Sequence, residues 1–253
     1  MFGWEHILLL VISVAAIAVA TVLVAMKWGW NKKILYVCCG ISVVSELSKI
    51  LIFMMPSPEG YFLPPERLPF HLCSIQIIFI FMLTFSKSEK VKKVLVSLMY
   101  PTLIGGGIMA LFIPTSSVNY GWWAPISFQY WIFHAMLIFL ALCMIITKPI
   151  KFDMKSYGIA LLFLVCAFVG AIYMNSILGG YEANVNFFYV ARPPLEGLPV
   201  LNMDLGWYFY VFNLSWLAVL LVTIAYIPVF VRFIREKRAK SNPKTIESAQ
   251  EKS

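Results

Sequence analysis

The residues best suited to chemistry are one cysteine and three histidines in a very apolar chain. Cys73 ends the segment 67–73 (Arg-Leu-Pro-Phe-His-Leu-Cys), at the mouth of an apolar run of membrane length. His6, His71 and His134 also lie in or at the edge of such runs. Hydrocarbon penalises polar groups, so those kept there usually have a partner or a function. A thiolate is a nucleophile, and an imidazole is a suitable base to generate it.

Cys73 and His134 form the candidate catalytic pair. Cys73 is expected in the first turn of a helix that begins at Pro69, because proline is favoured at the first helical position. The positive end of the helix dipole favours a thiolate there. On a regular helix His71 lies about 200° from Cys73, so His134, from another segment of similar depth, is the better base. The alternative is that these groups only hydrogen-bond across packed helices.

The elements that must position this pair are membrane-spanning helices. Of 253 residues, 61% are hydrophobic and 13% are charged, whereas water-soluble domains have about 25% charged residues. Apolar runs of about 20 residues cross a bilayer core, and the chain has seven of them: 5–26, 33–55, 70–86, 94–113, 126–147, 157–179 and 207–231. The expected fold class is an all-α membrane protein, a bundle of seven transmembrane helices over residues 1–231. Residues 232–253 form a basic tail that is expected to be cytoplasmic and disordered.

The basic residues predict the orientation of the bundle. All but three of the 20 Lys and Arg residues fall in the first, third and fifth connections and in the tail. Because such residues stay on the cytoplasmic side, the N-terminus is expected outside and the C-terminus in the cytoplasm. This distribution accounts for the net charge of +8 without a nucleic-acid partner.

Polar residues within the spans gather in their predicted outer halves, with Glu46 near the middle of its span. They are His6, Glu46, Lys49, His71, Gln76, Gln129, His134, Asn175 and Asn213. Their common depth predicts a polar cavity that is open toward the outer side. Interhelical hydrogen bonding is the alternative for each residue.

Glu46 and Lys49 continue a polar stripe that begins at Ser42 and Ser45, with helical i, i+3, i+4, i+7 spacing. One interpretation is an ion pair buried within the bundle. In the other, Glu46 orients a histidine or Lys49 contacts an anionic head group.

Three further features have simpler interpretations. Gly105–Gly107 follow Pro101 in the fourth run and predict close helix packing. The remaining cysteines, Cys38, Cys39, Cys143 and Cys166, match no zinc spacing. They are expected to be small apolar core residues, so neither a metal nor a cofactor is expected.

The connection 180–206 is long for a membrane protein. Its aromatic residues Phe187, Phe188 and Tyr189 predict an interfacial anchoring belt. Alternatively the connection is a lid over the cavity, with Arg192 binding a lipid phosphate through paired donors.

The segment 68–73 resembles the LP-x-HLC signature of the bacterial YwaF-like integral membrane proteins, and the segments 128–134 and 206–210 also fit that family. The family is distantly similar to eukaryotic multipass ether-phospholipid acyltransferases, which use a cysteine and a histidine. The resemblance implies that this pair falls on Cys73 and His134, and that the protein lies in the bacterial plasma membrane. The chain departs from the pattern at Ser74, where many relatives have Asp.

The leading hypothesis is a lipid acyltransferase or acyl hydrolase that acts on a membrane phospholipid or another acyl lipid. Cys73 attacks the ester, His134 transfers the proton, and Gln76, Gln129 or Asn175 donates to the oxyanion. The alternative is a transporter or binding protein for a small polar or amphipathic solute, with Glu46, Lys49 and the histidines as its binding groups. A sensor is a third option. The sequence does not indicate the oligomeric state.

Overall fold

The computed structural model describes residues 3–29, 31–57, 60–147, 151–181, 184–195, 197–198 and 200–240. In chain order its elements are α1 (Trp4–Leu23), η1 (Val24–Trp28), α2 (Lys32–Phe53), β1 (Met55–Ser57), β2 (Gly60–Phe62), η2 (Pro65–Arg67), α3 (Leu72–Phe85), α4 (Glu89–Phe112), α5 (Thr115–Tyr120), α6 (Pro125–Thr147), α7 (Met154–Leu178), η3 (Phe187–Tyr189) and α8 (Trp207–Lys240). Among these, 6 helices are long and apolar enough to cross a membrane. The protein is therefore a multipass helical membrane protein.

All seven predicted runs fold as helices, but the third is shorter than expected. α3 has 14 residues, or about 21 Å of axis, against a bilayer core of about 30 Å. Its predicted start at Pro69 was wrong, because the helix begins at Leu72. Leu68 is extended, as the residue before a proline usually is, and His71 is the extended cap residue of α3.

Two small elements between the long helices were not predicted. β1 and β2 form an antiparallel hairpin in which Met55 pairs with Phe62 and Ser57 with Gly60. The short helix α5 precedes α6. At the other end of the chain, α8 continues through Lys240, into the segment that was expected to be disordered. Residues 241–253 of that tail lie outside the described residues.

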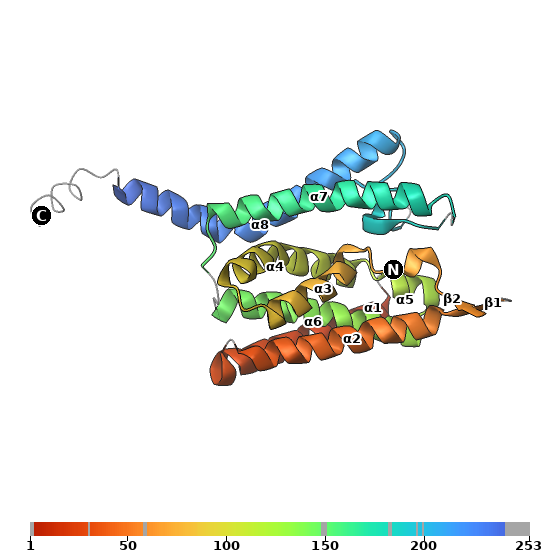
Figure 1. Cartoon of the computed structure of the whole chain (residues 1–253), viewed down its shortest axis with the longest axis horizontal. Coiled ribbons are helices and arrows are strands. Elements are labelled where there is room, and N and C mark those ends of the chain that lie inside the picture. The colour runs from red at the N-terminus through yellow and green to blue at the C-terminus, as the bar shows by residue number, and fades with distance from the viewer. Residues whose placement is uncertain are drawn as a thin grey trace, which may run out of the picture.

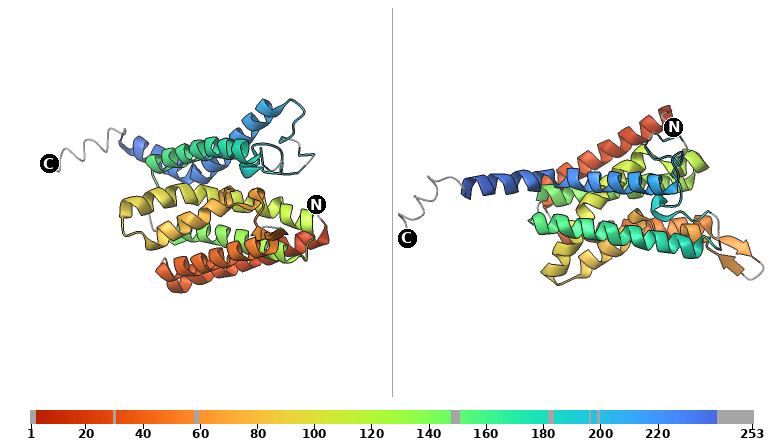
Figure 2. Two further views of the ribbon diagram at one scale, coloured as in Figure 1. Left: turned by 45° about the vertical axis from the view of Figure 1, so that its right-hand side comes forward. Right: turned by 90° about the horizontal axis from the view of Figure 1, so that it is seen from above.

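The helices are arranged in layers (Figure 1). α4 and α6 are central: α4 contacts α3, α6, α7 and α8, and α6 also contacts α1 and α2. α7 and α8 pair along one side of the bundle, and α2 lies on the opposite side (Figure 2). This arrangement leaves large apolar side chains of α1, α7 and α8 exposed, as expected of helices that face lipid.

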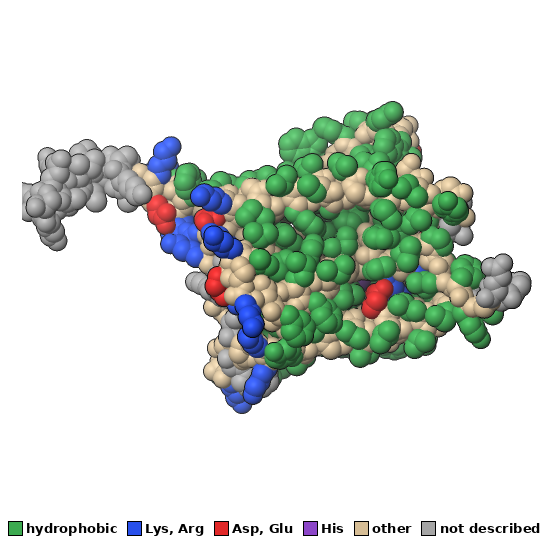
Figure 3. Space-filling view, viewed as in Figure 1, with side chains coloured by type: hydrophobic (Ala, Val, Ile, Leu, Met, Phe, Trp, Pro, Cys, Tyr) green, Lys and Arg blue, Asp and Glu red, His purple; other side chains and the backbone are tan. Residues whose placement is uncertain are grey.

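The basic residues gather at one end of the bundle (Figure 3). Helices that begin there have polar caps: Asn31 accepts from Lys33 N at 2.9 Å, and Asp153 accepts from Ser156 N at 2.8 Å. Lys93 donates to the Asp153 carboxylate at 2.7 Å, and this hydrogen bond lowers the pKa of the carboxyl to about 2. The caps satisfy N–H groups that have no partner within the helix.

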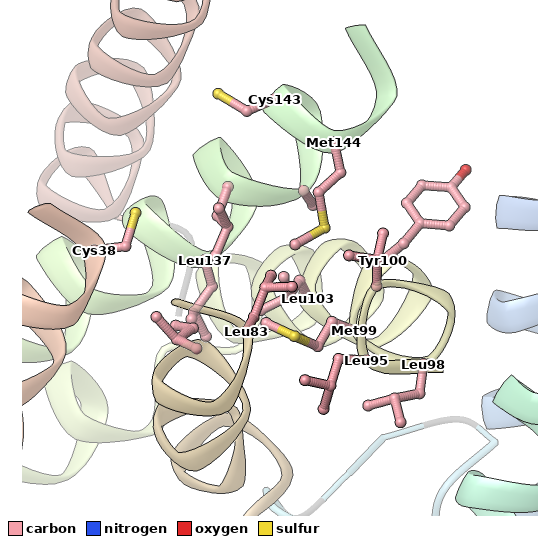
Figure 4. Packing of buried hydrophobic residues seen from close by; sticks show 14 of the residues in the cluster. Cys38, Leu83, Leu95, Leu98, Met99, Tyr100, Leu103, Leu137, Cys143 and Met144 are labelled. Carbon is pink, nitrogen blue, oxygen red and sulfur yellow. The ribbon is translucent and has the colours of Figure 1, made fainter. Parts of the chain in front are cut away.

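The buried core packs mainly around α4 and α6 (Figure 4). Pro101 lies inside α4, and a proline has no N–H for the carbonyl four residues earlier, here that of Ser97. The hydroxyl of Tyr226, which is fully buried in α8, donates to this carbonyl at 2.8 Å. The bond connects α8 to α4 at the point where the helical ladder of α4 is broken.

Replacing Tyr226 with Phe is expected to lower the free energy of unfolding by about 1–3 kcal/mol. The change removes one hydroxyl and leaves the Ser97 carbonyl without its partner inside the bundle. Thermal unfolding in detergent measures the loss. Tyr173→Phe is the matched control because Tyr173 is exposed on α7. Equal melting temperatures for the two variants would contradict the role of this hydroxyl.

Candidate functional site

A cavity of about 360 Å³ lies at the end of the bundle that carries η2, α5 and η3. Six of the residues predicted from the sequence to form the polar cavity or the catalytic pair line it: Glu46, Lys49, His71, Cys73, Gln129 and His134. Cys73 comes from α3 and His134 from α6. The fold thus brings the thiol and two imidazoles to the wall of one space.

Cys73 lies in the first turn of α3. The first bond of this helix runs from Ile75 N to His71 O at 3.0 Å, so the amides of Leu72, Cys73 and Ser74 precede the helical ladder. Such amides carry the positive end of the helix dipole and favour an anion beside them. Cys73 therefore lies at a helix N-terminus, as predicted, although His71 rather than Pro69 precedes the first helical residue.

The imidazole of His134 is held in one orientation. Its Nδ1 lies 2.7 Å from the carbonyl oxygen of Tyr130, one turn earlier in α6. A carbonyl oxygen only accepts, so Nδ1 must carry the proton in this bond and Nε2 has the lone pair. The Tyr130 ring lies 4.1 Å from the His134 ring, centre to centre, and fixes it further. This tautomer leaves Nε2 as the nitrogen that can accept a proton.

His71 lines the same cavity. The helical angle that separated it from Cys73 does not apply, because His71 precedes α3 and has extended backbone angles. Its ring lies 5.4 Å from that of Phe187 and 5.6 Å from that of Tyr189. His71 is thus packed against the long connection that covers the site.

Two ion pairs form the charged wall of the cavity, which we define as Glu46, Lys49, Glu66 and Arg67. Lys49 Nζ lies 2.7 Å from Glu46 Oε1, and Arg67 Nε lies 3.5 Å from Glu66 Oε1. The ion pair expected between Glu46 and Lys49 is present, and both residues line the cavity. Away from the basic end, Figure 3 shows acidic and basic side chains next to each other within a largely apolar part of the surface.

Arg67 was not among the predicted site residues. Its guanidinium lies 3.9 Å from the centre of the Phe53 ring and donates to the hydroxyl of Tyr120. The sequence did offer a reason to include Arg67, because it belongs to the same segment 67–73 that contains His71 and Cys73. Tyr130 and Thr115 also line the cavity and had no sequence signal of comparable strength, whereas Tyr189, which lines it too, belongs to the connection that was considered as a lid.

Two predicted residues are buried away from the cavity wall. Gln76, which is 1% exposed, donates to Thr102 at 3.0 Å. His6 lies 2.9 Å from the Leu111 carbonyl oxygen and stacks on Trp122, with 5.3 Å between ring centres. Both connect neighbouring helices within the bundle.

Three other predicted residues hold the connection 180–206. Asn175 donates to Phe187 O at 2.9 Å and accepts from Phe187 N at 2.7 Å. Asn213 donates to Val200 O at 3.2 Å, and Arg192 donates to Asn184 O at 3.0 Å. The cavity wall includes none of the three, so they position the connection rather than face the cavity.

The aromatic residues of η3 are not an exposed belt at the membrane surface. Phe187 and Phe188 are buried, and Phe188 and Tyr189 line the cavity. Both have positive φ values, 55° and 57°, which are strained for residues with a side chain. The strain is sustained by three anchors on neighbouring helices: the Asn175 amide, the Trp207 indole N–H to Val190 O, and the Tyr210 hydroxyl to Tyr189 O. The connection therefore contributes residues to the cavity wall, but Arg192, which the lid interpretation placed on a lipid phosphate, is not among them.

Comparison with protein-family models identifies the family of the chain. A family model described as the TMEM164 family matches residues 1–226. The chain belongs to the TMEM164 family. Its assignment to the YwaF-like family was therefore wrong. No curated protein and no solved structure matches the chain.

The other cysteines of this TMEM164 family member lie outside the cavity wall. Cys38 and Cys143 are fully buried in the apolar core (Figure 4), and Cys39 lies 3.2 Å from the Thr84 hydroxyl. Cys166 is exposed on α7, so the prediction that it is a core residue was wrong. Within the described residues, no group of three His, Cys, Asp or Glu side chains is arranged to hold a metal.

Gly107 sets the distance between α4 and α6 at His134. A Cβ at this position would lie 2.5 Å from Ile138 Cγ1 and 3.4 Å from His134 O. The close packing predicted for the glycines thus applies to Gly107, whose missing side chain lets α6 approach α4.

Replacing Gly107 with Ala is expected to destabilise the fold by about 1–3 kcal/mol through overpacking. Thermal unfolding in detergent measures the change. Gly170→Ala in α7 is the control, because a Cβ there meets nothing within 4 Å and alanine favours helix. A Gly107→Ala variant as stable as the control would show that Ile138 moves aside at little cost.

Proposed function

We propose that the protein is an integral membrane lipid acyltransferase or acyl hydrolase, with Cys73 as nucleophile and His134 as base. The observation that carries the proposal is the shared cavity. It contains a thiol at a helix N-terminus, an imidazole of fixed tautomer, a charged wall and an apolar wall. These features match the parts of an acyl lipid, namely a reactive ester, a polar head group and a hydrocarbon chain.

In the first step, His134 Nε2 takes the thiol proton while Cys73 Sγ bonds to the carbonyl carbon of the ester. The C–O bond of the ester then breaks, and His134 returns the proton to the leaving alcohol. In the second step, a hydroxyl of the acceptor lipid, or water, gives its proton to His134 and attacks the thioester. The C–S bond breaks and the thiol is restored. This is nucleophilic catalysis with a general base and acid.

The backbone amides at the start of α3 are better candidates to stabilise the oxyanion than the amide side chains proposed from the sequence. Gln76 and Gln129 donate to Thr102 and Ser45 respectively, and Asn175 is engaged with Phe187. The backbone amides beside Cys73 precede the helical ladder. Backbone donors of this kind stabilise the charge that develops on a carbonyl oxygen.

The proposal includes seven crossings, with the N-terminus outside and the basic end in the cytoplasm. α3 returns the chain from the cavity end to the basic end between α2 and α4 (Figure 1). The segment 63–71, which includes η2, completes this crossing. Protein and the cavity surround it, and non-helical backbone is stable at membrane depth in such surroundings. An impermeant thiol reagent outside intact cells should label a cysteine introduced at Tyr61 but none introduced at Lys92. The reverse result would invert the topology.

Trapping of the covalent intermediate tests the function. The purified protein is incubated with a phospholipid that carries a labelled acyl chain and is then analysed by mass spectrometry. The expected result is a labelled Cys73 peptide. Neutral hydroxylamine should remove the labelled acyl group from it, as it does from a thioester. Turnover of the lipid with no acyl group on Cys73 would refute the covalent mechanism.

Transport of a small solute predicts a different ranking of variants. A transporter that uses Glu46 and Lys49 should tolerate Cys73→Ala and fail with Glu46→Gln. The acyltransferase should fail with Cys73→Ala and retain part of its activity with Glu46→Gln, because Glu46 lies on the charged wall rather than in the catalytic pair.

A further inference from the structure

The wall of the cavity opposite the charged residues is apolar and follows the helix axes. Its side chains come from α7 and α8: Leu164, Phe168, Leu214, Leu217, Ala218 and Leu221. The α8 residues extend over about 10 Å of helix axis. An elongated apolar surface within a membrane-spanning bundle fits a hydrocarbon chain better than a compact polar solute.

Gly105 and Gly106 lie on α4 between this apolar wall and the thiol. A Cβ at Gly106 would lie 3.9 Å from Leu72 Cδ2, next to Cys73, and a Cβ at Gly105 would lie 3.7 Å from Leu221 Cβ. Both residues line the cavity. Unlike Gly107, neither is required for close packing of the helices, since these distances are ordinary van der Waals contacts.

We infer that the apolar wall binds the acyl chain of the substrate, and that Gly105 and Gly106 keep the passage from Cys73 to this wall open. The inference rests on the proposed function and assigns two specificity-determining residues to it. The ester then lies at Cys73, the chain runs along α8, and the head group faces the charged wall. A Cβ at 105 or 106 fits at ordinary contact distances, and larger side chains at these positions narrow the passage.

Thiol-reactive alkyl methanethiosulfonates of increasing chain length test the inference. Each transfers an alkylthio group to a cysteine and releases methanesulfinate. Mass spectrometry of the full-length protein in detergent gives the labelling rates of Cys73 and of Cys166. Because Cys166 is exposed on α7, it corrects for the partition of longer reagents into detergent.

The Cys73 to Cys166 rate ratio is expected to rise with chain length in the wild type, because a chain bound on the apolar wall holds the reagent beside the Cys73 thiol. Gly105→Leu should lower this ratio at least about tenfold for long reagents and leave it unchanged for short ones. Gly40→Leu in α2 is the matched control and should behave as the wild type, because Gly40 is exposed and a Cβ there meets nothing within 4 Å. If Gly105→Leu does not fold, Ala218→Leu narrows the same passage from α8.

A ratio independent of chain length in the wild type would overturn the inference, and so would equal losses for short and long reagents in the folded variants. The labelling reaction needs no enzymatic turnover. A rising ratio without a trapped acyl group on Cys73 would therefore refute the proposed function and support the chain site. A ratio that does not change with chain length, together with a trapped acyl group on Cys73, would support the proposed function and refute the acyl-chain site.

Discussion

Replacing Cys73 with Ala should reduce acyl transfer by at least about 10⁴-fold, because loss of the nucleophile removes the covalent route. The Cys73 side chain is partly buried, and alanine keeps the helix propensity of α3. The fold should therefore survive, and thermal unfolding in detergent checks that it does. The activity is measured as transfer of a labelled acyl chain between phospholipids in reconstituted vesicles.

Cys166→Ala is the control for this variant. It also removes a thiol from an apolar helix, but Cys166 is exposed on α7 and does not line the cavity. Its activity should equal that of the wild type. A Cys73→Ala protein with more than a tenth of wild-type activity would place the nucleophile elsewhere.

Replacing His134 with Asn should reduce acyl transfer by about 10²–10⁴-fold, the usual contribution of a general base. Asparagine has an amide N–H near the position of Nδ1, so it can keep the bond to the Tyr130 carbonyl. It has no basic nitrogen at the position of Nε2. The variant therefore separates proton transfer from the packing of α6. The same vesicle assay measures the loss, and labelling of Cys73 by a short thiol reagent shows whether the thiolate has also become less available.

His71→Asn is the comparison for this second variant, because His71 also lines the cavity. Its ring packs against Phe187 and Tyr189, so the change should reduce the rate less than His134→Asn does. The reverse order would make His71 the base and would leave His134 as a packing residue of α6.

The order of these effects follows from how the site is supported. Cys73 is placed by the start of α3, and His134 by one hydrogen bond and by the close approach of α4 and α6 at Gly107. The η3 segment closes the cavity and is fixed by Asn175 and Tyr210. Changes in these supporting residues should displace the site, whereas changes in the pair should abolish its chemistry.

Sequence patterns predicted the helices well because a bilayer imposes a simple rule of length and polarity. The positions of α1, α2, α4, α6, α7 and α8 follow from runs of about 20 apolar residues. The same rule failed for the start of α3, because Phe70 is apolar and yet belongs to the non-helical segment that precedes Leu72. Hydropathy does not distinguish a helix from an extended, non-helical segment that is buried in protein.

The sequence alone determined a membrane-spanning helical protein with a segregated basic end, and it placed a thiol and imidazoles at the opposite depth. These properties depend on composition and on position along the chain. Only the tertiary structure decided which of the polar residues share a cavity. It brought Arg67 and Tyr189 to the wall and left His6, Gln76 and Asn175 as packing or anchoring residues. Depth along a helix is encoded by spacing, but the direction in which a side chain faces depends on which helices become neighbours.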